Sequence, residues 1–128
     1  MEKHLEQDIE ALIVEDETDI CFLLTGILRK KNLHSSCVNN IHEARDMLAT
    51  RHPSILFLDN HLPDGYGVDF IQHIKRSHPL IRIVMITADD TLANKNKALN
   101  AGADFFIGKP FTRDTINKTI DTVMEHSH

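Results

Sequence analysis

The sequence contains no tryptophan and one tyrosine, and it has no hydrophobic run near the roughly 20 residues that a membrane-spanning helix needs. Its first residues lack the apolar core of a signal peptide. Basic side chains are fewer than acidic ones, with 14 Lys and Arg against 19 Asp and Glu, and the formal net charge is -5. Because nucleic-acid phosphates bind basic surfaces, this charge argues against direct nucleic-acid binding. We expect a cytoplasmic protein whose partners include neither membrane nor nucleic acid.

Cysteine is scarce, and the two that occur, Cys21 and Cys37, lie in separate apolar stretches. In a reducing compartment such residues are usually small buried thiols, so we expect two free thiols in the core rather than a disulfide. The nine histidines lack the paired His/Cys spacing of a zinc site, and we expect them on loops and helix flanks, exposed to solvent. No G-x-x-x-x-G-K-[ST] segment occurs, which excludes a P-loop nucleotide-binding protein, and Gly65-Tyr66-Gly67 is expected to be a turn.

What the sequence does contain is an alternation of short apolar runs and helical patterns, over a length that suits one domain. Most runs are continuous and rich in β-branched or aromatic residues, as in parallel strands that are covered on both faces. The second run is the most polar, which indicates an edge strand. The five predicted strands are Ala11-Leu12-Ile13-Val14, Ser36-Cys37-Val38, Ile55-Leu56-Phe57-Leu58, Ile81-Arg82-Ile83-Val84-Met85-Ile86 and Phe105-Phe106-Ile107.

Amphipathic helical patterns lie between these runs. The strongest stripe, with spacing i, i+3, i+4, i+7 and i+8, is formed by Ile20, Leu23, Leu24, Ile27 and Leu28. Weaker stripes are formed by Ile41, Ala44 and Leu48, by Phe70, Ile71 and Ile74, and by Ile116, Ile120, Val123 and Met124.

The helical pattern before Gly102 is the weakest, with only Leu92, Ala98 and Leu99 to bury. Gly102 can take the positive φ that often ends a helix. Thr112 is a suitable N-cap for the last helix, because its hydroxyl oxygen can accept a backbone N–H of the first turn.

Strands that alternate with helices in one short domain imply βα units with right-handed crossovers. We therefore predict an α/β fold: a doubly wound, five-stranded parallel sheet of flavodoxin-like strand order 2-1-3-4-5 with five helices, forming a three-layer sandwich. Residues 1–128 are expected to form a single domain, with its core at about residues 10–125 and with residues 1–8 frayed.

Chemically reactive side chains directly follow four of the five predicted strands. Glu15 and Asp16 follow the first, Asp59 the third, Thr87 ends the fourth, and Lys109 comes just after the fifth. Ligands of an open parallel sheet bind outside the carboxyl ends of its strands, so these side chains are expected at one edge of the sheet.

Three carboxylates at one edge repel each other and raise one another's pKa unless a cation is present. Mg²⁺ resolves this, because it binds carboxylate oxygens and phosphate oxygens together. Lys109 and Thr87 would then hold a phosphoryl group by charge and hydrogen bonding. A carboxylate can act as the nucleophile that forms an aspartyl-phosphate. The sequence thus predicts an aspartate that accepts a phosphoryl group in a Mg²⁺-dependent reaction.

Four segments, in this order, carry a family resemblance: Val14-Glu15-Asp16-Glu17, Leu58-Asp59-Asn60-His61-Leu62-Pro63-Asp64-Gly65, Ile86-Thr87-Ala88 and Gly108-Lys109-Pro110-Phe111. Together they resemble the signature set of the receiver domains of response regulators in two-component signalling, including chemotaxis-type single-domain regulators. The resemblance runs from about Ala11 to Met124. It implies phosphorylation by a histidine kinase or a phosphotransfer protein.

The resemblance also implies the ligands of the metal. Asp59 would be the phosphoacceptor and would bind Mg²⁺ directly together with Asp16. The backbone carbonyl of His61 would supply a third ligand. Glu15 stands where the family more often has Asp, and would act on the metal through water.

The remaining roles concern the phosphoryl group and the switch. Thr87 and Lys109 would contact the phosphoryl oxygens, and the backbone amides of Asn60 and Ala88 would complete the cradle. The Lys109-Pro110 peptide would be cis, which is accessible because the next residue is proline. Phe106 matches the aromatic residue that reorients when the threonine moves toward the phosphate.

Two hypotheses concern the rim of the site. His61 and Asp89 occupy positions whose side chains tune dephosphorylation in similar proteins, so we expect them to set the lifetime of the phosphorylated state unless they are merely solvated. Phe22 points away from the core stripe of the first helix, beside Thr18 and Thr25. The resemblance makes this helix the docking element for the phosphodonor, so Phe22 is either a donor contact or an isolated exposed apolar residue.

Several other functions fit less well. A flavodoxin-like electron carrier needs a Ser/Thr/Gly-rich phosphate cradle where this chain has Glu15-Asp16. A haloacid-dehalogenase-type phosphatase needs a second Asp where this chain has His61, and a substrate-capping insert. The remaining alternative is a receiver-like scaffold for protein interactions that works without phosphorylation.

We expect an autocatalytic phosphoacceptor rather than an enzyme with a separate substrate. Its output would pass to a downstream protein target or to an effector part of a longer parent chain. The protein is expected to be a monomer or a phosphorylation-dependent dimer.

Overall fold

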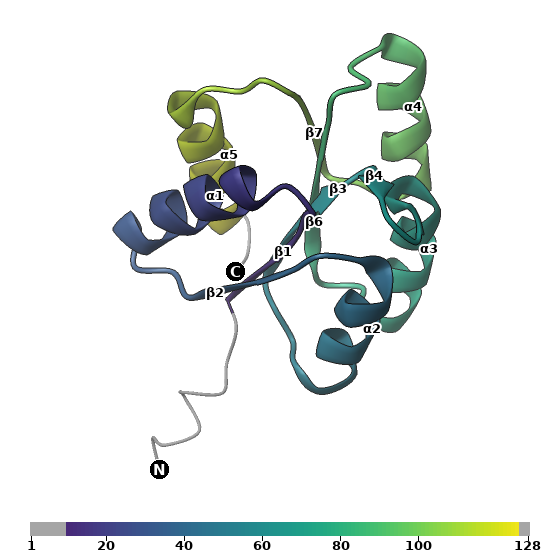
Figure 1. Cartoon of the computed structure of the whole chain (residues 1–128), viewed down its shortest axis with the longest axis horizontal. Helices are drawn as coiled ribbons and strands as arrows, with labels where there is room; N and C mark the ends of the chain where they lie inside the picture. The colour runs from purple at the N-terminus through teal and green to yellow at the C-terminus, as the bar shows by residue number, and fades with distance from the viewer. Residues whose placement is uncertain (1–9, 126–128) are drawn as a thin grey trace.

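The computed structural model describes residues 10–125 and contains a five-stranded parallel sheet in the order β2-β1-β3-β6-β7 (Figure 1). All five predicted strands are present, and their order is the predicted flavodoxin-like one, with the polar β2 at an edge. The prediction for residues 1–8 falls outside the described residues. The strands are β1 (Ala11–Val14), β2 (Ser35–Val38), β3 (Ile55–Asp59), β6 (Arg82–Thr87) and β7 (Phe105–Gly108).

Five helices cover the two faces of this sheet, as predicted. Helices α1 and α5 lie on one face, and α2, α3 and α4 lie on the other (Figure 1). Between residues 10 and 125, no helix is long and apolar enough to cross a bilayer. The helices are α1 (Thr18–Lys30), α2 (Ile41–Thr50), α3 (Gly67–Ser77), α4 (Leu92–Ala101) and α5 (Arg113–Glu125).

The core has two halves because strand side chains alternate between the two faces of the sheet. Ile13 and Phe57 pack on the α1/α5 side, whereas Leu12 and Leu56 pack on the α2/α3/α4 side. All of these side chains are at most 1% exposed. The predicted burial on both faces is therefore confirmed for the central strands.

The ends of the last two helices follow the sequence prediction, but the packing of α4 does not. Gly102 ends α4 with a φ of 123°, and the Thr112 hydroxyl accepts the Thr115 N–H at 3.1 Å. Of the three residues expected to be buried in α4, only Ala98 is; Leu92 is 73% and Leu99 38% exposed. The burial expected for these two leucines is wrong, because α4 turns them toward solvent rather than toward the sheet.

A short hairpin that the sequence analysis missed follows the acidic end of β3. Strands β4 (His61–Leu62) and β5 (Gly65–Tyr66) pair antiparallel where only a turn was expected. The Asp64 carboxylate between them accepts the N–H groups of Ile41 and His42 at 2.8 and 2.9 Å. These two bonds join the hairpin to the first turn of α2.

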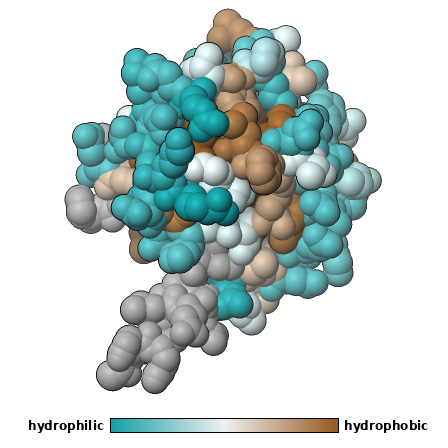
Figure 2. Space-filling model, turned by 60° about the vertical axis from the view of Figure 1, so that its left-hand side comes forward, coloured by the Kyte–Doolittle hydropathy of each residue, from teal (hydrophilic) through white to brown (hydrophobic). Residues whose placement is uncertain are grey.

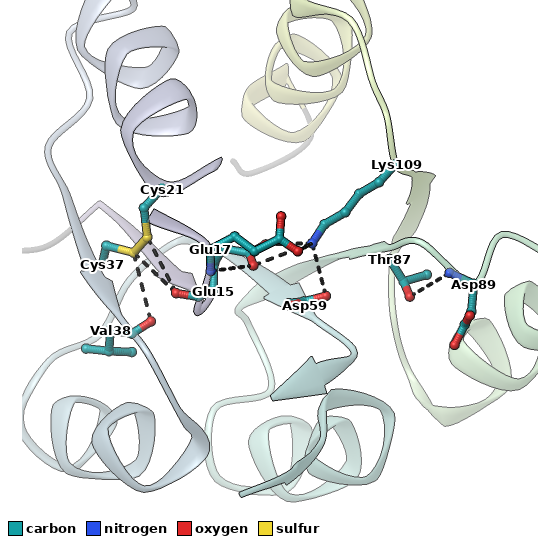
Figure 3. Close-up of polar contacts among 9 residues, drawn as sticks. All are labelled: Glu15, Glu17, Cys21, Cys37, Val38, Asp59, Thr87, Asp89 and Lys109. Carbon is teal, nitrogen blue, oxygen red and sulfur yellow. Dashed lines mark hydrogen bonds and ion pairs between the residues drawn. A yellow bond between two sulfur atoms is a disulfide. The ribbon is translucent and has the colours of Figure 1, made fainter. Parts of the chain in front are cut away.

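The two cysteines also differ from the prediction, since Cys21 of α1 and Cys37 of β2 form a disulfide (Figure 3). Neither is a core residue: Cys21 is half-buried and Cys37 is exposed. The register places Cys37 opposite Ile13, on the face that α1 covers. The two Cα atoms are 6.3 Å apart, within the range that a disulfide spans. The expectation of two separate buried thiols failed because it did not place α1 over the edge strand.

Candidate functional site

The structure brings the three predicted carboxylates together at the carboxyl edge of the sheet. Glu15 and Asp16 follow β1, and Asp59 ends the neighbouring strand β3. One carboxylate oxygen from each lies within 4.8 Å of the other two. Glu15 is 2% and Asp59 4% exposed, whereas Asp16 is at the surface. The site is therefore an acidic cluster with two buried members and one open to solvent.

Lys109 supplies the cation of the cluster, reaching it from the loop after β7 (Figure 3). The Lys109–Pro110 peptide bond is cis, as predicted. The Lys109 Nζ atom lies 3.1 Å from Glu15 Oε1, 3.4 Å from Asp59 Oδ1 and 3.4 Å from Glu17 Oε2. The contact of Lys109 with Glu17 was not predicted, because Glu17 lies in the loop after β1, where no strand or helix periodicity indicates the direction of a side chain.

The electrostatics of the cluster follow from this burial. Burial is the largest cause of the raised pKa of Glu15, from 4.5 to about 7; the Glu17 N–H and Lys109 oppose the rise, and Asp59 adds to it. Burial also raises the pKa of Asp59, against the effect of Lys109. Burial alone would lower the pKa of Lys109, but Glu15 and Asp59 raise it overall. Desolvation, more than the expected mutual repulsion, thus disfavours the charged carboxylates.

This donor set fits a small, hard dication. Glu15, Asp16 and Asp59 offer three carboxylate oxygens in one place, and Mg²⁺ prefers oxygen ligands. A single lysine ammonium faces three neighbouring carboxylates in Glu15, Asp59 and Glu17, so negative charge remains in excess. A divalent cation would offset the cost of burying ionised Glu15 and Asp59.

Thr87 and Phe106 lie on the other side of Asp59 from Glu15. The Thr87 side chain is 1% exposed, and its Oγ1 accepts the Asp89 N–H at 3.1 Å (Figure 3). Thr87, Asn60 and Phe106 line a cavity of about 270 Å³ between β6 and α4. Phe106 is half-buried there. Thr87 and Phe106, the residues predicted to form the switch, thus line one cavity together with Asn60, the residue that follows Asp59.

The two rim residues His61 and Asp89 are in direct contact. The His61 ring nitrogen Nε2 hydrogen-bonds Asp89 Oδ2, and both side chains are about half exposed. The ring of Tyr66 meets that of His61 edge-on, with 5.5 Å between centroids. The pair connects the hairpin after Asp59 with the loop after Thr87, and lines the cavity.

Gly67 allows the start of α3 to pack closely against Asp59, the phosphoacceptor candidate at the end of β3. A Cβ atom at Gly67 would lie 2.2 Å from the Asp59 carbonyl oxygen. The Gly67 N–H also donates to the Asn60 carbonyl oxygen at 2.8 Å, and the Val68 N–H donates to Asn60 Oδ1 at 3.0 Å. The start of α3 can therefore lie against the end of β3 only without a side chain at residue 67.

Helix α1 borders the site and carries an exposed aromatic ring, as predicted. Phe22 is 81% exposed. Figure 2 brings the α1 side of the molecule forward and shows hydrophobic residues reaching the surface between hydrophilic ones. An apolar ring on a helix beside a polar site is a suitable contact for a protein partner.

Most of the chain matches known proteins. The family model described as "Response regulator receiver domain" matches residues 11–121. The response regulator protein PilR of Pseudomonas aeruginosa is 37% identical over 115 residues, which are 90% of this chain and 26% of PilR. The chain thus spans about a quarter of the length of that relative.

Solved structures agree with the fold. The solution structure of the beryllofluoride-activated NtrC4 receiver domain dimer superimposes with a TM-score of 0.87 at 30% identity, covering 92% of this chain and 98% of that one. A two-component response regulator from Clostridium difficile has a TM-score of 0.88 at 24% identity, covering 93% of this chain and 98% of that one.

Proposed function

This chain belongs to the receiver domains of response regulators, and we propose that it is a phosphoacceptor switch that takes a phosphoryl group onto Asp59. The donor would be a histidine kinase or a phosphotransfer protein. The observation that carries the proposal is the position of Asp59: a buried carboxylate at a strand end, 3.4 Å from the Lys109 ammonium and within an acidic cluster.

The chemistry assigned to this chain is nucleophilic. An Asp59 carboxylate oxygen attacks phosphorus, the bond between phosphorus and the donor atom breaks, and the donor keeps the electron pair. The Lys109 ammonium, which pairs with the Asp59 carboxylate, would then pair with the phosphoryl oxygens, where the negative charge lies after transfer. Glu15, Asp16, Asp59 and the His61 carbonyl would hold Mg²⁺, which when bound would neutralise the carboxylates and the phosphoryl oxygens.

The switch would begin at Thr87. Its hydroxyl oxygen accepts the Asp89 N–H, and a phosphoryl group on Asp59 would offer an acceptor oxygen to its O–H. Moving Thr87 toward Asp59 would free room in the shared cavity for the Phe106 ring. The contact between Thr87 and the phosphate forms only when Thr87 has moved toward Asp59, so phosphorylation would favour that conformation.

The other parts of the proposal concern the cell. The protein would be cytoplasmic, and its output would pass to a downstream protein or to an effector part of a longer chain, as a monomer or as a phosphorylation-dependent dimer. It would be an autocatalytic acceptor that loses its own phosphate, with no separate substrate. The alternative is a scaffold whose interactions do not depend on phosphorylation.

The test is phosphorylation by acetyl phosphate, followed by intact mass. Wild-type protein with Mg²⁺ should gain about 80 Da, which is one phosphate. Asp59→Asn should gain nothing, and neither should wild type in a chelator. Asp46→Asn, which changes an exposed carboxylate on α2, is the matched control and should behave as wild type. Phosphorylation of Asp59→Asn, or none in wild type, would favour the scaffold.

A further inference from the structure

The disulfide lies directly against the residue that begins the acidic cluster. The sulfur of Cys21 lies 3.6 Å, and that of Cys37 4.0 Å, from the Glu15 carbonyl oxygen (Figure 3). The backbone N–H of Glu15 donates to the carbonyl oxygen of Val38, the residue after Cys37, at 3.0 Å. Both backbone polar groups of Glu15 therefore face the segment Cys37–Val38 or the disulfide itself.

The two sulfurs differ in access. Cys37 is exposed on the edge strand β2, whereas Cys21 is half-buried in α1. A soluble oxidant reaches Cys37 first, and Cys21 is close enough to complete the bond. Disulfides that form in a reducing compartment are usually reversible and regulatory.

We propose that Cys21 and Cys37 are a redox modification site whose dithiol–disulfide state sets the affinity of the acidic cluster for a divalent cation. The oxidant class is a low-molecular-weight disulfide such as glutathione disulfide. The Cys37 thiolate attacks one sulfur of that disulfide and releases one thiol; the Cys21 thiolate then attacks the Cys37 sulfur and releases the second. Two protein thiols lose two electrons and two protons, and one molecule of glutathione disulfide gains them to become two molecules of glutathione.

The coupling works through the loop from Glu15 to Glu17. This loop joins β1 to α1, and in the disulfide form Cys21 of α1 is covalently tied to Cys37 of β2, the strand that pairs with β1. In the dithiol form Cys21 and Cys37 are linked to each other only by packing and by weak S–H donation to the Glu15 carbonyl. Oxidation therefore restricts the loop before a cation binds. Cation binding to the oxidised form then loses less conformational entropy, so it is tighter.

The first test is the chemistry of the pair. The reduced full chain is equilibrated with mixtures of glutathione and glutathione disulfide, and thiols are counted while intact mass is recorded. We expect loss of both thiols together and of about 2 Da, without a glutathione adduct. The control is the double substitution Ser36→Cys with Cys37→Ser, which keeps a thiol on β2 but places it on the opposite sheet face. It should give adducts only. Adducts or covalent dimers in wild type would overturn the proposal.

The second test is linkage to the cation. Calorimetric titration with Mg²⁺ alone should show roughly two- to fivefold tighter binding to the oxidised than to the reduced chain. Reciprocally, saturating Mg²⁺ should shift the glutathione redox equilibrium toward the disulfide by the same factor. Equal Mg²⁺ affinities in the two redox states would overturn the coupling.

This inference rests on the proposed function for its cation site, but the tests fail separately. Thiol counts and Mg²⁺ heats need no phosphorylation. If the pair oxidises and shifts Mg²⁺ binding while Asp59 takes no phosphate, the phosphoacceptor proposal alone is wrong. If Asp59 is phosphorylated equally with or without the disulfide and Mg²⁺ binding is unchanged, the redox proposal alone is wrong.

Discussion

The Lys109 ammonium nitrogen lies 3.4 Å from Asp59 Oδ1, with the lysine side chain 11% and the aspartate side chain 5% exposed. Removing one partner of such a buried ion pair strongly lowers the stability of the fold, because the other charge stays buried without a partner. The same lysine also faces Glu15 and Glu17. One ammonium therefore serves both buried carboxylates of the cluster, Glu15 and Asp59, when no divalent cation is bound.

Replacing Lys109 by Met should destabilise the cation-free protein by roughly 1–3 kcal/mol, since buried carboxylates lose their counter-charge and must take up a proton. Mg²⁺ should restore most of the loss. Urea unfolding in chelator and in Mg²⁺ measures both. Lys118→Met removes an exposed pair with Asp114 on α5 and should change stability by less than about 0.5 kcal/mol. Equal effects of the two substitutions would refute the argument.

The raised pKa of Glu15, from 4.5 to about 7, has a consequence for stability. The folded chain holds a proton that the unfolded chain releases between these values, so the stabilisation is complete below pH 4.5 and is lost as the pH rises through 7. In chelator, the free energy of unfolding should fall by about 1–3 kcal/mol between pH 5 and 7.5. Glu15→Gln should flatten the profile, and Glu125→Gln should leave it as in wild type. A rise over this interval would contradict the assignment.

Two glycines make a matched pair. Gly67→Ala places a Cβ 2.2 Å from the Asp59 carbonyl oxygen and should destabilise the fold by about 2–3 kcal/mol while slowing phosphorylation of Asp59. Gly26→Ala in α1 meets nothing within 4 Å and should raise stability by roughly 0.5–1 kcal/mol. Denaturant melts of both variants decide the point. A neutral Gly67→Ala would show that α3 can move away from β3 freely.

The contact between His61 and Asp89 predicts a shared effect on phosphate lifetime. Removing either side chain opens the rim of the cavity to water, so His61→Ala and Asp89→Ala should each speed dephosphorylation by roughly three- to tenfold. Because the residues act as one pair, the double variant should match the singles rather than multiply them. Loss of phosphorylated mass with time gives the rates. Unchanged rates in both single variants would leave the pair without a role.

The exposed ring of Phe22 predicts a defect that is specific to protein donors. Phe22→Ala should slow phosphotransfer from the cognate histidine-phosphorylated donor by about fivefold or more, as expected for an aromatic contact at an interface. Phosphorylation by acetyl phosphate should be unchanged. Leu80→Ala removes a side chain that is 90% exposed before β6, at the opposite edge of the sheet, and serves as the control. Equal transfer to both variants would make Phe22 an isolated surface residue.

Much of the fold was predictable because buried parallel strands have a distinctive composition. Runs such as Ile55–Leu58 are recognisable as strands from sequence alone, and the flavodoxin-like sheet order predicted for them is the one observed. The carboxylates, Thr87 and Lys109 were likewise predictable, because each follows a strand and parallel strands end at one edge.

The remainder depended on contacts between distant segments. The hairpin at His61–Tyr66 has two-residue strands, which have no periodicity to detect. The disulfide required knowing that α1 covers the edge strand β2. The contact of Glu17 with Lys109 and that of His61 with Asp89 join loops from different strands, so only the assembled sheet reveals them.

Helix α4 is attached to the sheet by fewer buried side chains than its neighbours. In α4 only the Ala98 side chain is fully buried, whereas α2 buries two side chains and α3 buries three. Detaching α4 would expose little apolar area to water, so its amides should exchange hydrogen through local opening at a free energy well below that of global unfolding. We therefore expect the border of the molecule that displays Leu92 and Leu99 to open more readily than the sheet beside Thr87.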